Sequence, residues 1–136
     1  MAQERKVLKK DTDVYFSPVN WYIAGVLLRI EVGEKDETNE NRRCDAWENQ
    51  ILVKANNPEE AHKKALKFGK LEESEYLNPD GEKVKFTFEG LTTLTAIYDE
   101  LEDGAEIIWI EHENRTVRKI KSWVKKKEEL EVFQRD

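Results

Sequence analysis

The sequence predicts an α+β fold, in which an antiparallel, mainly meandering sheet of about five strands carries one helix on a face and has a second helix at the C-terminus. Two observations support this prediction. Runs of alternating apolar and polar residues recur between turn residues, and one well-capped helical pattern interrupts them at about residues 57–72. The 136 residues fit a single domain over residues 20–136, preceded by a loosely ordered N-terminal arm at residues 1–19.

The first two strands are expected at about residues 20–32 and 42–55. The stretch NWYIAGVLLRIEV is apolar on both faces, as in a central strand, and its β-branched residues favour a strand over a buried helix. Residues 33–41 hold no apolar side chain and are expected to form a loop. In the second strand, polar residues alternate with Trp47, Ile51 and Val53, which predicts one buried face.

The helix at residues 57–72 is predicted from its start and from its apolar stripe. Asn57 is a favourable N-cap and Pro58 fits the first helical position. The residues expected to pack on the sheet are spaced for one helix face: Ala61, Ala65 and Phe68.

Glu59 and His62 lie three residues apart in this helix, a spacing that carboxylate-bridged metal sites use. Such a site needs a second motif on a facing helix, and the other histidine, His112, lies in EHEN, which lacks the spacing. Acidic residues in a first turn also complement the helix dipole. We therefore interpret EEAH as a helix start, and we expect no metal and no cofactor.

The clearest local signal is the turn NPDG at residues 78–81, where proline and glycine stand in turn order. The strand after it should bury one face, formed by Val84, Phe86 and Phe88. A further strand is expected to reach Leu101, and AEIIWIEHE at residues 105–113 is expected to return as a strand that is apolar on both faces.

The C-terminal helix is expected at about residues 115–130, because Val117, Ile120 and Val124 are at helical spacing. Residues 115–127 hold seven Lys or Arg side chains and no acid. The candidate contacts to a phosphate or an acidic partner are Arg118, Lys119, Lys121, Trp123, Lys125 and Lys126. The alternative interpretation is an ordinary solvated helix face, partly neutralised by the glutamates that follow.

The composition predicts a cytoplasmic protein without a catalytic centre. Cys44 is the single cysteine and cannot form an internal disulfide, which favours a reducing compartment. The charged start MAQERKVLKK does not resemble a signal peptide, and the apolar run WYIAGVLL is much shorter than the roughly 20 residues that cross a bilayer. Asp45 beside Cys44 would not activate the thiol as a nucleophile. The net charge of −6 argues against a nucleic-acid partner, because nucleic acids are themselves negatively charged.

Three stretches resemble a small bacterial family labelled domain of unknown function 4288. They are WYIAGVLLRIEV, NQILVKANNPEEAHKKALKFGK and ESEYLNPDGEKVKFTFEGL, which together span about residues 20–101. The family pattern has a Trp-Tyr opening strand, a strand leading into a helix rich in Glu and Ala, and a Tyr-Leu-Asn-x-Asp-Gly-Glu turn before an aromatic strand. The turn is the most specific part. The resemblance supports the fold and implies no activity.

The function predicted from these features is a non-catalytic binding or protein-interaction module. Tryptophans are enriched at interfaces, and the candidate residues for binding a protein partner are Trp21, Trp47 and Trp109. Strands that are apolar on both faces present more apolar surface than two helices cover, which predicts a homodimer through the uncovered sheet face or its tryptophans. The alternative is a nucleic-acid-associated accessory protein that uses the basic helix at residues 115–127.

Overall fold

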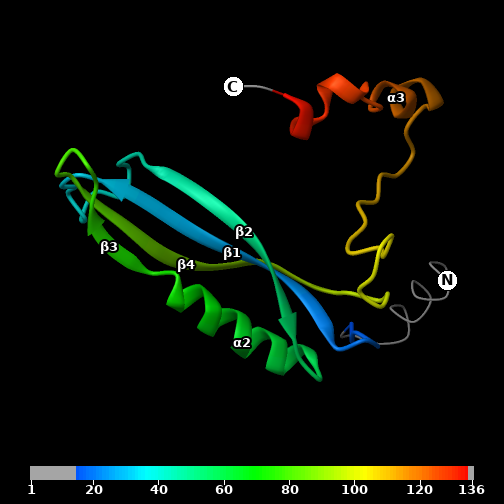
Figure 1. Cartoon of the computed structure of the whole chain (residues 1–136), viewed down its shortest axis with the longest axis horizontal. Coiled ribbons are helices and arrows are strands. Elements are labelled where there is room, and N and C mark those ends of the chain that lie inside the picture. Colours follow the sequence, from blue (N-terminus) through cyan, green and yellow to red (C-terminus); the bar gives the residue numbers. More distant parts are fainter. Residues whose placement is uncertain (1–14, 135–136) are drawn as a thin grey trace.

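The computed structural model describes residues 15–134 and shows a four-stranded antiparallel sheet with one long helix on one face (Figure 1). The sheet order is β2-β1-β4-β3, where the strands are β1 (Trp21–Val32), β2 (Asp45–Lys54), β3 (Ser74–Leu77) and β4 (Lys83–Ala96). Helix α2 (Pro58–Leu71) connects β2 to β3. The α+β prediction is confirmed, and the sheet has four strands rather than about five.

The central strand β1 is held at its start by a serine. The Trp21 N–H donates to Ser17 Oγ at 3.1 Å, and the Ser17 hydroxyl donates to the Ile97 carbonyl oxygen at 2.5 Å, just beyond the end of β4. Ser17 itself is 5% exposed. The predicted arm at residues 1–19 lies for the most part outside the described residues, so its looseness stays a prediction.

Strand β4 was predicted as two strands, and this prediction was wrong. Two register shifts interrupt its pairing with β1, so that Glu89 and Thr92 of β4 have no partner residue in β1. Each bulge adds one residue and shifts the apolar alternation by one position. The sequence pattern therefore breaks near Gly90, although the strand itself continues from Lys83 to Ala96.

The strand predicted at residues 105–113 is also absent from the sheet as the structure describes it. The strand expected to reach Leu101 ends at Ala96, and residues 105–113 run on without strand pairing. The apolar side chains of this stretch are mostly exposed, namely Ile107, Ile108 and Ile110. Seven acids and no Lys or Arg occupy residues 97–113. We attribute the misprediction to this charge density, because carboxylates in neighbouring positions repel one another when they are desolvated together.

The predicted start of helix α2 is confirmed. Asn57 Oδ1 accepts a hydrogen bond from the Glu60 N–H at 2.8 Å, and Pro58 occupies the first turn. The packed stripe differs by one position, because Ala61, Ala65 and Gly69 are buried while Phe68 is 40% exposed. A Cβ atom at Gly69 would overlap the ring of Phe88, so the helix approaches the sheet most closely at a residue without a side chain.

The predicted turn between β3 and β4 is confirmed. Gly81 has a φ of +80°, a conformation that favours glycine, and its N–H donates to the Asn78 carbonyl oxygen at 2.9 Å. The Asn78 side chain accepts hydrogen bonds from the N–H groups of Asp80 and Glu82 at 3.0 and 2.8 Å. This turn places β3 on the outer side of β4.

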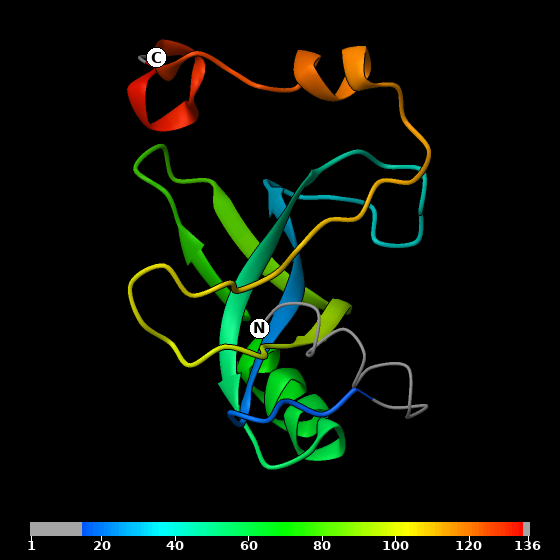
Figure 2. The same ribbon diagram turned by 90° about the vertical axis from the view of Figure 1, so that its right-hand side faces the viewer.

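The C-terminal helix predicted at residues 115–130 is much shorter in the structure. It is reduced to α3 (Val117–Ser122), which is followed by the 3-10 turns η1 (Lys127–Glu129) and η2 (Glu131–Phe133). Figures 1 and 2 both place these elements apart from the sheet, and none of their residues is buried. An isolated helix shorter than roughly 12 residues is marginal in water, so helical spacing alone does not extend α3.

Candidate functional site

An aromatic patch, formed by Trp47, Tyr76 and Phe86, lies on the sheet face that carries α2. The Trp47 and Phe86 rings meet edge to face with centroids 5.5 Å apart, and the Tyr76 and Phe86 rings stack at 6.4 Å. Trp47 is 53% exposed and Tyr76 is 52% exposed. The patch therefore combines side chains from β2, β3 and β4 in one surface that remains half open to solvent.

The strand register explains why these three rings share a face. Phe88 contacts α2 and is paired with Leu28, so Leu28 marks the α2 face of β1. Trp47 is also paired with Leu28, and Phe86 is paired with the next residue on that face, Ile30.

Helix α2 ends before it reaches the patch. Gly69, in its last turn, lies over Phe88, and the helix stops at Leu71. Figure 1 shows α2 beneath one end of the sheet, while the end with the β3–β4 turn has no helix beneath it. The aromatic patch lies on that uncovered end.

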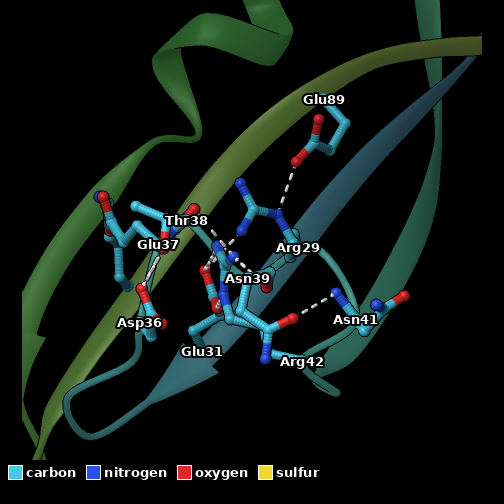
Figure 3. A network of polar contacts seen from close by, with 10 residues as sticks. Arg29, Glu31, Asp36, Glu37, Thr38, Asn39, Asn41, Arg42 and Glu89 are labelled. Carbon is cyan, nitrogen blue, oxygen red and sulfur yellow. Dashed lines mark hydrogen bonds and ion pairs between the residues drawn. The ribbon is translucent and has the colours of Figure 1, made fainter.

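A charged network lies on the opposite face, and we call Arg29, Glu31, Arg42 and Glu89 the arginine–glutamate network (Figure 3). Glu31 is 5% exposed and accepts from Arg29 Nη1 at 2.6 Å and from Arg42 Nε at 2.7 Å. Arg29 Nε also donates to Glu89 Oε2 at 2.5 Å. Glu89 is one of the two bulged residues of β4, and bulges re-aim side chains in this way. The hydrogen bond from Arg42 and the charge of both arginines hold the pKa of Glu31 below its ordinary value.

Arg42 also fastens the loop between β1 and β2. Its Nη1 donates to the carbonyl oxygens of Glu37 and Asn39 at 3.2 and 2.9 Å. Within the loop, Asp36 accepts from the N–H and the hydroxyl of Thr38, and these hydrogen bonds hold the pKa of Asp36 below its usual range. One arginine thus joins the long polar loop to the buried glutamate of β1.

A hollow of about 470 Å³ opens beside this network. Its lining is Arg29, Glu37, Glu40, Arg42, Cys44 and Glu89. Both arginines already donate to glutamates, and the carboxylates of the lining outnumber its guanidinium groups. The hollow consequently offers no excess positive charge for an anion, and the contacts fit a role in anchoring the loop.

The three tryptophans predicted for partner binding lie in different environments. Trp47 belongs to the aromatic patch, whereas Trp21 lies on the opposite face, where the Lys54 ammonium is 5.7 Å from its ring centroid. Trp109 packs against the core cluster, with its ring centroid 6.3 Å from that of Tyr98. Burial raises the pKa of the Tyr98 hydroxyl to about 12. The structure does not bring the three tryptophans together.

The predicted phosphate-contact residues lie on and after α3, all of them exposed, namely Arg118, Lys119, Lys121, Trp123, Lys125 and Lys126. Thr116 caps the helix, since its Oγ1 accepts from the Lys119 N–H at 3.1 Å. The Trp123 and His112 ring centroids lie 4.5 Å apart, and His112 belongs to the acidic stretch at residues 97–113. Because α3 ends at Ser122, the basic residues do not form one continuous helix face.

The residues weighed for metal or nucleophile chemistry are exposed and scattered. His62 is exposed on α2, and Cys44 is a free, exposed thiol directly before β2. Among residues 15–134, no group of three or more His, Cys, Asp or Glu side chains is arranged to hold a metal ion. The helices described for this chain are all too short or too polar to span a membrane.

Sequence reasoning missed Tyr76, Phe86 and the arginine–glutamate network as site residues. Phe86 alternates with polar neighbours, which predicts a core residue. Its surroundings are open to solvent because α2 is shorter than the sheet and ends before it reaches Phe86. Arg29 and Glu31 are two residues apart, so a strand assignment places them on one face. That spacing was the available signal for the network.

The chain belongs to the family described as Domain of unknown function (DUF4288), whose model matches residues 21–109. The match confirms the resemblance seen over about residues 20–101 and extends it through Trp109. No curated protein and no solved structure matches the chain. The description of the family assigns no activity, so a functional proposal depends on the residues themselves.

Proposed function

We propose that this DUF4288 domain is a non-catalytic protein-interaction module whose aromatic patch binds an apolar surface of a partner protein. One observation carries the proposal. Trp47 and Tyr76 each expose about half of their surface although both contact Phe86, so an apolar platform stays open beside α2. Large aromatic side chains are enriched among the residues that dominate binding energies.

The surroundings of the patch enlarge this platform. Val32 on β1, which is paired with Val84 and so lies on the same face, is also exposed, at 41%. Covering the open part of such side chains stabilises a complex by about 25 cal/mol per Å² of apolar area, before the costs of association. A partner that buries this end of the sheet would complete the layer that α2 begins.

We further propose a cytoplasmic location for this module. Cys44 is exposed and free in the structure. An exposed thiol persists most readily where cellular reductants keep it reduced, as in the cytoplasm. The acidic, highly charged surface would keep the domain apart from other chains until the aromatic patch meets a complementary surface.

A second candidate function is that of a nucleic-acid-associated accessory protein. Residues 115–127 carry seven basic side chains, all exposed, together with Trp123. Basic residues near an aromatic ring suit a phosphate backbone and its bases. The acidic stretch at residues 97–113 lies directly before this segment and contacts it through His112 and Trp123, which favours the first candidate.

The two candidates are separated by comparing Tyr76→Ser with Leu77→Ser in the full chain. Both residues lie on β3, but Tyr76 faces the aromatic patch, whereas Leu77, 70% exposed, faces the other side. Proteins captured from cell extract would be quantified by mass spectrometry at low and high salt, with and without nuclease.

We expect Tyr76→Ser to reduce recovery of the captured partner at least about tenfold, and Leu77→Ser and high salt to change it little. Equal recovery by both variants would contradict the role of the aromatic patch. Loss of binding at high salt or after nuclease treatment, independent of Tyr76, would support the nucleic-acid candidate instead.

A further inference from the structure

Strand β2 forms an edge of the sheet that is long and open. It has ten residues and pairs only with β1, and the β1–β2 register runs from Trp21 to Ile30 without a shift. Natural edge strands are usually protected by shortness, a bulge, a proline or an inward charge. Strand β2 has neither a bulge nor a proline, and it therefore presents its backbone for further pairing.

The hydrogen bonds at the end of β2 show which backbone groups face outward. The Ala55 N–H donates to the Asn20 carbonyl oxygen at 2.9 Å, which makes these two residues a hydrogen-bonded pair. In an antiparallel ladder such pairs alternate, so the odd-numbered residues of β2 bond to β1. The even-numbered residues point their N–H and C=O groups away from the sheet: Ala46, Glu48, Gln50, Leu52 and Lys54.

One of these outward groups has a partner, since Lys64 Nζ on α2 donates to the Lys54 carbonyl oxygen at 2.5 Å. Within the described part of the chain, no hydrogen bond reaches the outward backbone groups from Ala46 to Leu52. The open portion of the edge is thus seven residues long, and the half-exposed Trp47 lies within it.

We propose that this edge pairs with β2 of a second copy of the chain, antiparallel and centred on Asn49. The proposal specifies one partner for the interaction module described above and gives a structural basis for the expected homodimer. A two-fold axis through Asn49 would join two four-stranded sheets into one. Four outward residues on each strand would form roughly eight hydrogen bonds between the main chains.

The side chains favour this register over its neighbour. With Asn49 opposite Asn49, Trp47 lies opposite Ile51 on the α2 face, and Glu48 lies opposite Gln50 on the other face. An aromatic residue opposite a β-branched residue is a stabilising cross-strand pair, and no two like charges face each other. Centring the pair on Glu48 would set two glutamates opposite each other, which is destabilising.

A second copy suits the edge better than residues 105–113 of the same chain. That segment carries three glutamates among its nine residues and would bring them beside Glu48. In the structure it joins none of the described strands, and its Trp109 packs on the core cluster instead. Self-pairing of β2, by contrast, places polar amides at its centre.

The register is tested by a cysteine at the two-fold axis in a chain that also carries Cys44→Ser. In an antiparallel pair, opposing residues that are not hydrogen-bonded to each other lie about 4.5 Å apart at Cα, which a disulfide can bridge. Asn49→Cys should therefore oxidise in air to a covalent dimer, twice the 16.0 kDa of one chain. Gln50→Cys is the matched control, because its two copies would be about 7–8 Å apart and on the opposite face.

A second test removes one outward N–H without touching the β1–β2 ladder. Gln50→Pro should convert the dimer to a monomer in light scattering after size-exclusion chromatography, while Gln50→Thr, which keeps the N–H, should remain dimeric. A circular dichroism spectrum like that of the parent chain establishes that the proline variant is folded.

Two results would overturn the proposal. One is a parent chain of 16.0 kDa at all concentrations whose Asn49→Cys variant does not cross-link faster than Gln50→Cys. The other is a dimer that Gln50→Pro leaves intact. Neither result bears on the Tyr76 and Leu77 comparison, because both of those residues lie on β3 at the far side of the sheet.

Discussion

The two edges of the sheet differ in how far their backbone is available for pairing. At one edge, β3 has four residues, and beyond its pairing with β4 the Phe88 N–H donates to the Glu73 carboxylate at 3.1 Å. That hydrogen bond holds the pKa of Glu73 below its usual range. At the other edge, β2 is open from Ala46 to Leu52. The two edges thus differ, because one is short and closed by a carboxylate, whereas the other is open at the edge where we propose that a second copy pairs.

The largest expected effect is the difference in stability between proline substitutions on the inward and the outward side of β2. Ile51 bonds to β1, so Ile51→Pro removes a ladder hydrogen bond and an apolar side chain that packs on the core, and it should destabilise the fold by about 3 kcal/mol. Gln50→Pro should cost much less, because its N–H faces outward. Urea unfolding of both variants measures the difference. Equal losses would mean that the assignment of the two sides of β2 is wrong.

A smaller effect is expected at the opposite edge, where the turn fixes β3. Gly81 has a φ of +80° and no atom within 4 Å of an added Cβ, so Gly81→Val tests backbone strain alone. We expect a loss of about 1–3 kcal/mol, measured by thermal unfolding. Gly104→Val is a matched control outside the sheet, with a φ of +87° and likewise no atom within 4 Å of an added Cβ, so it strains a turn that does not position β3. A melt unchanged by Gly81→Val would show that the turn is not needed to hold β3.

The arginine–glutamate network connects β1 to the loop that leads into β2, and its effect should depend on pH. Glu31→Gln removes the charge that both arginines contact, and it should destabilise the protein by about 1 kcal/mol at pH 7. Glu89→Gln is the control, because among the described residues Glu89 forms an ion pair with Arg29 alone and its side chain is 43% exposed. The larger loss should occur in the Glu31 variant.

The sign of the pH dependence follows from the pKa of Glu31, which lies below its ordinary value of 4.5 in the folded state. A group of this kind stabilises the fold above its unfolded pKa and loses that contribution as the pH falls through the folded pKa. The stability difference between the parent chain and Glu31→Gln should therefore be constant near neutral pH and shrink below about pH 4.5. A difference that stays constant down to pH 3 would contradict this account.

The smallest effect is expected outside both edges, in α3. Ile120 is 47% exposed, and Ile120→Ala should change the free energy of unfolding by less than about 0.5 kcal/mol. Leu28→Ala in β1, where the side chain is 1% exposed, should cost about 2–5 kcal/mol in the same thermal or urea experiment. A large loss in the Ile120 variant would mean that α3 packs on the sheet.

The features that sequence predicted correctly depend on neighbouring residues. The turn at residues 78–81 needs only its own proline, glycine and amide, and the start of α2 needs only Asn57 and the N–H groups beside it. The predicted strands at residues 20–32 and 42–55 contain β1 and β2, because their apolar patterns are long. Such local signals are sufficient to place an element, although not always its last residues.

The features that sequence predicted incorrectly depend on distant residues. The bulges at Glu89 and Thr92 arise from pairing with β1, and no local pattern distinguishes a bulge from a strand end. Residues 105–113 and 115–130 have the apolar spacing of a strand and of a helix, yet most of their apolar side chains are exposed, with Trp109 packed on the core cluster as the exception. Apolar periodicity predicts a helix or strand correctly only when the fold provides an apolar surface on which that element packs.

In the candidate site, too, some features follow from neighbouring residues and others from distant ones. Trp47 was predicted as a partner-binding residue from its residue type, and its exposure is consistent with that role. Its neighbours Tyr76 and Phe86 could not be grouped with it, because the grouping follows from the strand register and from the point at which α2 ends. The open edge of β2 likewise emerges only from the order of the strands.

Hydrogen exchange of the β2 amides, followed residue by residue with NMR, tests the central claim that this edge binds a second copy. The inward amides of Asn49, Ile51 and Val53 should be protected in all samples. The outward amides of Glu48, Gln50 and Leu52 should be protected at high protein concentration and lose that protection on dilution. Outward amides that exchange freely at every concentration, while the inward amides stay protected, would contradict the claim. Protection of the outward amides that does not change on dilution would instead assign the edge to a segment of the same chain.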